Sequence, residues 1–164
     1  MASKKTANTN DVIDISLSTI RKKRFRIDGD NTRILELNTS DLNILGRLKE
    51  AYPKLLNLTE NAVKNWPSME EDVENVFESE KTTQVINILE EIDTEMRKLM
   101  DYIFDSNVSE ICAPYGSMYD PINGGFRFEH IIETLSPLYE TDLVGETNKI
   151  STRLQKHTSK YVKK

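Results

Sequence analysis

The sequence predicts a mainly α-helical protein with an N-terminal β-hairpin, a helical bundle after it, and flexible basic termini. Apolar residues recur every three or four positions over most of the chain, whereas one stretch near the N-terminus alternates apolar and polar residues around a turn. The 164 residues suit one core, but only 37% are hydrophobic and 30% are charged. This composition favours a thin core with long, solvated helices.

Charge divides the chain into three parts. Residues 1–26 hold seven Lys or Arg and two Asp, and residues 145–164 hold six Lys or Arg and one Glu, so each end carries a net charge of +5. Because the whole chain carries −5, the middle carries −15. We therefore expect a flexible N-terminal arm at residues 1–20, a hairpin and helical domain at 21–144, and a basic C-terminal tail at 145–164.

Two alternating runs predict the β-hairpin. Apolar and polar residues alternate in residues 24–28 and again in 33–37, and the residues between them, Gly29 to Asn31, are typical of turns. The acidic turn has some of the spacing of a calcium-binding loop. That reading fails because the twelfth position is Thr39 and not a bidentate Glu, so turn chemistry is preferred.

A Leu-rich helix is expected to follow the hairpin. Asp41 and the two hydroxyl residues before it can cap its N-terminus, and apolar residues then recur every three or four positions as far as Trp66. Pro53 lacks the amide hydrogen that a helix interior needs. We therefore expect either a kink at Pro53 or a division into two shorter helices.

A second and longer helix is expected to begin at Ser68. Ser68 and Glu71 have the spacing of a capping box, and residues 89–103 carry the most regular apolar periodicity of the chain. Residues 78–83 are polar on all sides. A helix break there is as well supported as one continuous helix.

The rest of the chain predicts a helical turn, a loop and a last helix. Residues 107–113 suit one helical turn, and residues 115–125 are dense in Gly, Pro, Asn and Asp, which predicts a loop. Apolar spacing from Phe126 to Tyr139 then predicts a helix that Pro137 shortens or kinks.

No catalytic, metal-binding or cofactor-binding residues are predicted. Cys112 is the only cysteine, and with only His130 and His157 there is no metal-ligand spacing. We interpret Cys112 as a packing residue and His130 as a packing or capping residue. No apolar run is long enough to span a membrane and the N-terminus is polar, so we expect a cytoplasmic protein without membrane contact that is not an enzyme.

Clustered cations near the hairpin are candidate anion-contacting residues. They are Arg21, Lys22, Lys23, Arg24 and Arg26. Such clusters release counterions from a phosphate backbone, so with the Lys-rich tail they leave open a nucleic-acid-binding protein. A solvated or partner-facing strand is preferred, because no recognition helix or stacking platform accompanies the run and the acidic middle repels phosphate. We expect at most weak, salt-sensitive binding.

A wide apolar patch in the long helix is the candidate partner-binding surface. It consists of Met96, Leu99, Met100, Ile103 and Phe104. Methionine adapts to irregular partners, and so acidic a chain has few elements that could cover the patch internally. The alternative is that these residues form the core.

The order of these elements resembles that of the phage tail assembly chaperones. The resemblance covers residues 22–142 and rests on a hairpin, RFRIDGDNTRILEL, a Leu-rich helix, LNILGRLKEAY, a later helix, MRKLMDYIFDSNVSEI, and a last helix, FEHIIETLSPLYE. It implies a non-enzymatic chaperone in the host cytoplasm that coats the tape measure protein until tail tube subunits polymerise around it. Tail tube protein and a second copy of the chain are further candidate partners. A structural component of the phage tail or neck is the alternative.

Overall fold

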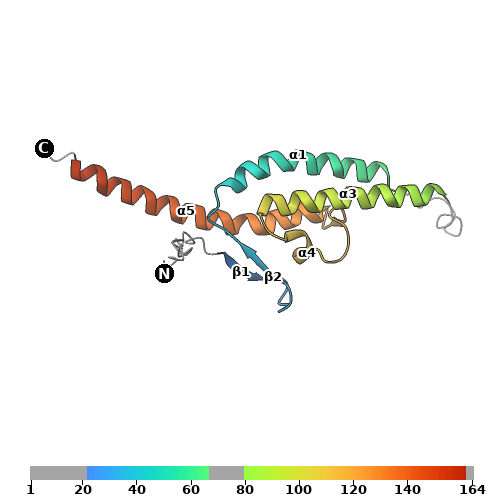
Figure 1. Ribbon diagram of the computed structural model, residues 1–164, viewed down its shortest axis with the longest axis horizontal. Coiled ribbons are helices and arrows are strands. Elements are labelled where there is room, and N and C mark those ends of the chain that lie inside the picture. Colours follow the sequence, from blue (N-terminus) through green and yellow to red (C-terminus); the bar gives the residue numbers. More distant parts are fainter. Residues whose placement is uncertain (1–21, 67–79, 162–164) are drawn as a thin grey trace, which may run out of the picture.

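The computed structural model describes residues 22–66 and 80–161. Over these residues the protein is mainly α-helical, with a hairpin before the helices, which confirms the predicted fold class (Figure 1). The predicted arm at 1–20, Arg21 and the Ser68–Glu71 capping box lie outside the described residues. The elements are β1 (Lys23–Arg26), β2 (Ile34–Leu37), α1 (Asn43–Lys64), α3 (Glu80–Phe104), α4 (Val108–Cys112), β3 (Pro121–Ile122), β4 (Gly125–Phe126) and α5 (Arg127–Tyr161).

The β1–β2 hairpin forms where the alternating pattern predicts it. The strands are antiparallel, with Lys23 opposite Leu37 and Arg26 opposite Ile34. Leu37 is fully buried, whereas Arg26 on the opposite face is exposed, so the hairpin covers the core with one face only. Gly29 adopts a φ of 74°, a conformation that residues with a Cβ rarely take. Turn chemistry therefore accounts for this segment.

Helix α1 begins where the capping residues predict and continues past its proline. The Asp41 carboxylate accepts a hydrogen bond from the Asn43 amide at 2.9 Å, which satisfies one of the free N–H groups of the first turn. The helix runs without interruption to Lys64, so the division into two helices at Pro53 is wrong. Pro53 is exposed, so the carbonyl that loses its partner there is on the solvent side.

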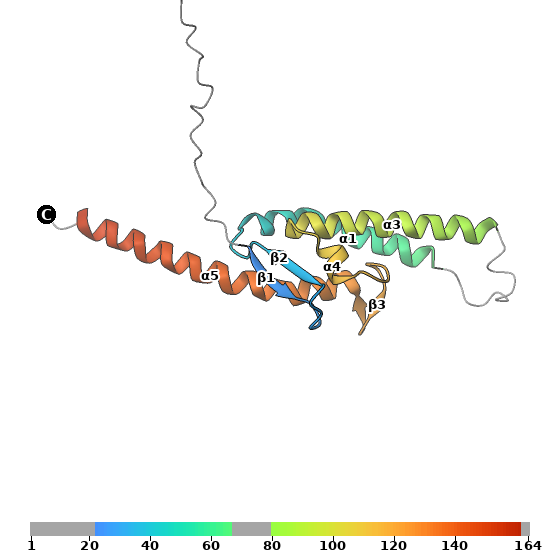
Figure 2. The ribbon, with the colours of Figure 1, turned by 60° about the horizontal axis from the view of Figure 1, so that its bottom comes forward.

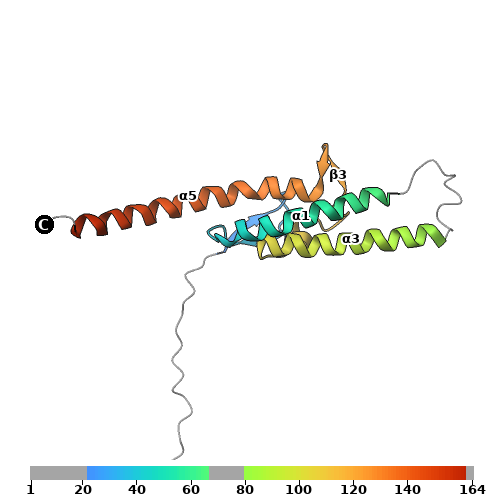
Figure 3. The same ribbon diagram turned by 90° about the horizontal axis from the view of Figure 1, so that it is seen from above.

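Three helices build the body of the molecule. Helices α1 and α3 lie side by side, and the first half of α5 lies along them, with the β1–β2 hairpin beside α5 (Figures 2 and 3). Tyr52 of α1 meets Phe128 of α5 with ring centroids 6.2 Å apart. Phe104 of α3 meets Tyr139 of α5 at 6.0 Å. Aromatic side chains therefore tie α5 to both other helices.

The predicted partner-binding patch is the centre of this core, which corrects that prediction. Met96, Met100 and Ile103 are fully buried, Phe104 is 3% exposed, and Leu99 is partly buried against the same cluster. Periodicity identified the apolar face of α3 correctly. It gave no information on the elements that cover that face, which are α1, α4 and the first half of α5.

Arg97 joins α3 to the segment that follows α4. Its Nε donates to the Asp93 carboxylate at 2.6 Å, and both side chains are mostly buried. Its Nη atoms donate to three backbone carbonyl oxygens, those of Ser109, Ala113 and Gly116, at 3.2, 3.0 and 2.6 Å. Asp93 also accepts a hydrogen bond from the Met118 amide at 2.6 Å. The Arg97–Asp93 ion pair thus provides hydrogen-bond donors for three backbone carbonyl groups and an acceptor for one backbone amide.

Two further arginines satisfy carbonyl groups at helix C-termini. Arg33 donates from Nε to the Ile111 carbonyl at 2.9 Å and from Nη2 to the Cys112 carbonyl at 3.1 Å. Arg47 donates from Nε to the Ile103 carbonyl at 2.9 Å. The last carbonyls of a helix have no partner within it and carry the negative end of its dipole, so a guanidinium group there stabilises the helix end.

The predicted loop at 115–125 contains a second small hairpin, and this loop fixes the start of α5. Strands β3 and β4 pair antiparallel. The Arg127 amide donates to the Asp120 carbonyl at 2.9 Å, and the Phe128 amide donates to the Met118 carbonyl at 3.0 Å. Since Met118 is itself held by Asp93, the position of α5 along α3 is set through this loop.

Helix α5 is longer than the sequence predicts. It continues past Pro137 and through residues 145–161 without a break, so the basic segment predicted as a separate tail is a continuation of the last helix over these residues. Beyond Leu143 this helix leaves the body and projects away from it (Figure 1).

Replacing Met100 by Asp should unfold the protein. The side chain is fully buried, and an unpaired carboxylate in the core costs about 4 kcal/mol or more. Circular dichroism during thermal unfolding should show lost helicity or a much lower melting temperature. The matched control is Leu154→Asp, because Leu154 is 62% exposed and should leave the melting of dilute protein unchanged. A folded Met100→Asp variant with normal melting would contradict the assignment of this patch to the core.

Replacing Arg97 by Met should lower the free energy of unfolding by about 2–4 kcal/mol, because it removes four charge-assisted hydrogen bonds but keeps most of the apolar stem. Denaturant unfolding measures this loss. The control is Arg24→Met, whose exposed pair with Glu36 should contribute less than about 1 kcal/mol. Equal effects of the two substitutions would show that Arg97 does not hold the loop.

Candidate functional site

The basic cluster of the hairpin is exposed but partly neutralised by its own protein. Lys22, Lys23, Arg24 and Arg26 lie at the surface. Lys23 forms an ion pair with Asp142 of α5 at 2.6 Å, and Arg24 pairs with Glu36 across the hairpin at 3.2 Å. The hydrogen bond from Lys23 and a second one from the Thr39 hydroxyl hold the pKa of Asp142 below its usual range. Two of these four cations are therefore engaged within the molecule.

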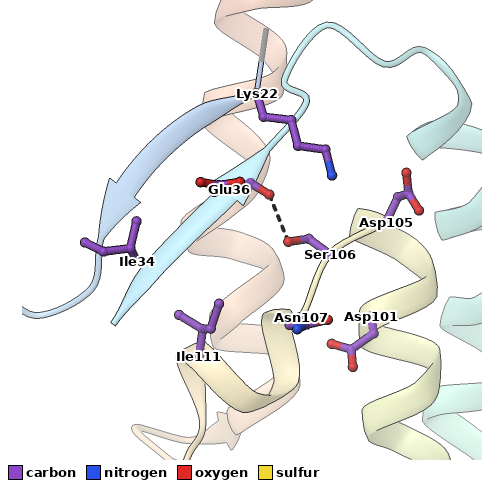
Figure 4. Close-up of a pocket in the computed structure, with 8 residues that line it drawn as sticks. All are labelled: Lys22, Ile34, Glu36, Asp101, Asp105, Ser106, Asn107 and Ile111. Carbon is purple, nitrogen blue, oxygen red and sulfur yellow. Dashed lines mark hydrogen bonds between the residues drawn. The ribbon is translucent and has the colours of Figure 1, made fainter. Parts of the chain in front are cut away.

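Lys22 also lines an open pocket of about 530 Å³ between the hairpin and the α3–α4 connection (Figure 4). Asp101 and Asp105 contribute carboxylates to it. The Asp101 carboxylate already has hydrogen-bond partners, because it accepts hydrogen bonds from the amide and the hydroxyl of Ser109 at 2.7 and 2.9 Å. These bonds hold the start of α4. Among residues 22–66 and 80–161, no group of three or more His, Cys, Asp or Glu side chains could hold a metal ion.

A smaller cavity of about 250 Å³ brings Cys112 and His130 together, which sequence reasoning missed. Cys112 ends α4 and His130 lies in the first turns of α5, and both helices border the hairpin at Ile27. Burial raises the pKa of the Cys112 thiol to about 11. A nucleophilic cysteine needs the opposite shift, so at neutral pH this side chain is a protonated packing group.

The second half of α1, the residues that follow it as far as Trp66, and the first half of α3 carry an apolar surface that no other described element covers, which we call the open face. It comprises four side chains that are 40–49% exposed: Leu56, Val63, Trp66 and Ile86. Helical spacing shows which way it points. Leu56 and Val63 follow Tyr52 by four and eleven residues, and Tyr52 contacts α5. The open face therefore continues the side of α1 on which α5 packs.

Ile86 lies on the matching side of α3. It precedes Asp93 by seven residues, and Asp93 contacts the loop that leads into α5. At the end of α1, Trp66 meets Tyr119 of that loop edge-on, with ring centroids 6.2 Å apart. Two exposed carboxylates flank the apolar side chains, because Glu60 and Glu90 each follow an open-face residue by four positions.

The second surface with exposed apolar side chains is on the part of α5 that leaves the body, residues 144–161, which we call the projecting helix. Val144, Ile150 and Leu154 on it are 57–62% exposed. Arg153 and Lys149 are exposed beside Ile150 and Leu154, and Lys149 pairs with the Glu146 carboxylate at 2.6 Å. This surface is thus apolar and basic, whereas the open face is apolar and acidic. The helix segments that carry the two surfaces lie at opposite ends of the molecule (Figure 1).

Sequence reasoning missed both surfaces. The signal for the projecting helix was present, because Ile150 and Leu154 keep helical spacing beyond Gly145. For the open face, the apolar stripe as far as Trp66 was recognised, but no local pattern could show that it is exposed, since its exposure depends on where α5 begins. None of the helices within 22–66 and 80–161 combines the length and hydropathy that crossing a membrane requires.

Comparisons of the chain with protein-family models, with curated proteins and with solved structures each gave no match.

Proposed function

We propose that this protein is a non-enzymatic assembly chaperone that holds an amphipathic helix of a partner protein on its open face. The observation that carries the proposal is the set of four half-exposed apolar side chains on the side of α1 and α3 that α5 covers elsewhere. A helix placed there would extend the three-helix packing of the body. Recognition of an amphipathic helix by an apolar helical surface is a recurrent mode of protein binding.

The expected affinity is modest. Complete burial of a large apolar side chain contributes about 1.5–3 kcal/mol, so covering four that are already half buried contributes a few kcal/mol before the cost of association. Reversible binding suits a chaperone, which must release its partner. The carboxylates of Glu60 and Glu90 favour a partner helix with Lys or Arg beside its apolar stripe.

The resemblance to phage tail assembly chaperones names the partner: a tape measure protein, held in the host cytoplasm until tail tube protein assembles around it. The net charge of −15 on the middle of the chain would keep such a complex soluble. Nucleic-acid binding is the weaker proposal, because Lys23 and Arg24 are paired with carboxylates of their own chain. A structural tail or neck component would use the same surfaces but would remain in the particle.

Glutamate at two positions of the open face, Val63→Glu with Ile86→Glu, should abolish capture of the tape measure protein, because each carboxylate would be buried without a partner. The assay is co-purification after expression of both proteins in one cell. Circular dichroism should show that the variant keeps its fold, since both positions are nearly half exposed.

The matched control for this test is Ile88→Glu. Ile88 is 40% exposed and sits on the same helix, but two residues turn a helix by about 200°, so its side chain is on a different side of α3 from Ile86. The control should retain the partner. Equal capture by the two variants, or no capture by the unmodified protein, would contradict the proposed function.

A further inference from the structure

We infer that the projecting helix of one molecule occupies the open face of a second copy, so that the protein associates head to tail. This inference goes beyond the proposed function, because it concerns the protein without any client. It names a segment of the chain itself as the occupant of the open face.

The first argument is the offset of α5. Its first half packs on α1 and α3, and its second half continues as the same helix beyond them (Figures 1 and 3). At the other end of the molecule, α1 and α3 extend past the start of α5. Among the described elements, the end of α5 therefore extends beyond the α1–α3 pair at one end of the molecule. At the other end, the α1–α3 pair extends beyond α5.

The second argument is the face that the projecting helix presents. Ile150 and Leu154 follow Leu143 by seven and eleven residues, and Leu143 is partly buried against the core of its own body. The apolar side of the projecting helix is thus a continuation of the side by which α5 already packs. A second copy can cover it with the packing that the body uses.

The third argument is charge. Residues 145–164 carry +5 and the middle of the chain carries −15. Arg153 and Lys149, which pairs with Glu146 at 2.6 Å, flank the apolar side chains of the projecting helix, whereas Glu60 and Glu90 flank those of the open face. Two projecting helices would repel each other, but a projecting helix and an open face attract. Complementarity therefore favours the head-to-tail contact over a symmetric one.

A head-to-tail contact uses different surfaces on the two molecules, so it adds copies until a ring closes or a filament grows. It also covers the open face. Self-association would then keep this apolar surface out of water, and a client would have to displace the projecting helix of a neighbour.

The test uses two variants of the full chain. One, Ile150→Asp with Leu154→Asp, disables the projecting helix, and the other, Val63→Asp with Ile86→Asp, disables the open face. Sedimentation velocity over a range of concentrations should show concentration-dependent assembly of the unmodified protein and only monomers of either variant alone. An equimolar mixture should form a heterodimer and nothing larger, because one intact surface of each kind remains. Circular dichroism verifies that each variant is folded.

Three outcomes would overturn the inference: a monomeric unmodified protein at all concentrations, a mixture that stays monomeric, or self-association of the open-face variant alone, which would mean that projecting helices pair with each other. The sedimentation experiment contains no tape measure protein, so it measures self-association independently of partner binding. The Ile150→Asp, Leu154→Asp variant keeps an intact open face, so its capture of the tape measure protein tests the proposed function alone. If this variant does not capture the tape measure protein, that result counts against the proposed function and not against self-association.

Discussion

The ion pair between Arg97 and Asp93 is the contact on which the rest of the structure depends. Arg97 holds three carbonyl groups around α4, and Asp93 holds the Met118 amide. The Met118 carbonyl in turn accepts the hydrogen bond of the Phe128 amide at the start of α5. A chain of hydrogen bonds thus runs from the middle of α3 to the first turn of α5. It fixes where α5 begins along the helix pair.

The position at which α5 begins determines what the protein can bind. Because α5 starts beside the middle of α1, only its first half is used in the body (Figure 1). The same offset exposes Leu56, Val63 and Ile86 at one end and Ile150 and Leu154 at the other. In each of these two surfaces, apolar residues recur with the helical spacing of a core face but their side chains are exposed to solvent. This combination is expected of a binding site.

Local patterns in the sequence predicted the elements but not what covers them. The alternation around Gly29 and the acceptor at Asp41 predicted the hairpin and the start of α1, because both depend on neighbouring residues. The apolar stripe at Met100 was identified, but burial by α1 and α5 is a long-range property that periodicity does not contain. The arginine contacts to carbonyl groups left no signal, since a backbone acceptor can belong to any residue type.

Amide hydrogen exchange along α5 tests most directly whether only the first half of this helix packs on α1 and α3. In dilute protein, amides of residues 131–143 should be strongly protected, because they belong to the core. Those of residues 146–153 should exchange almost freely, because the side chains of this segment are exposed and a helix that buries little apolar surface opens readily. At high concentration the second set should become protected while the first set stays unchanged. Equal protection along the whole of α5 in dilute protein would contradict the account, because it would mean that a single molecule covers its own projecting helix.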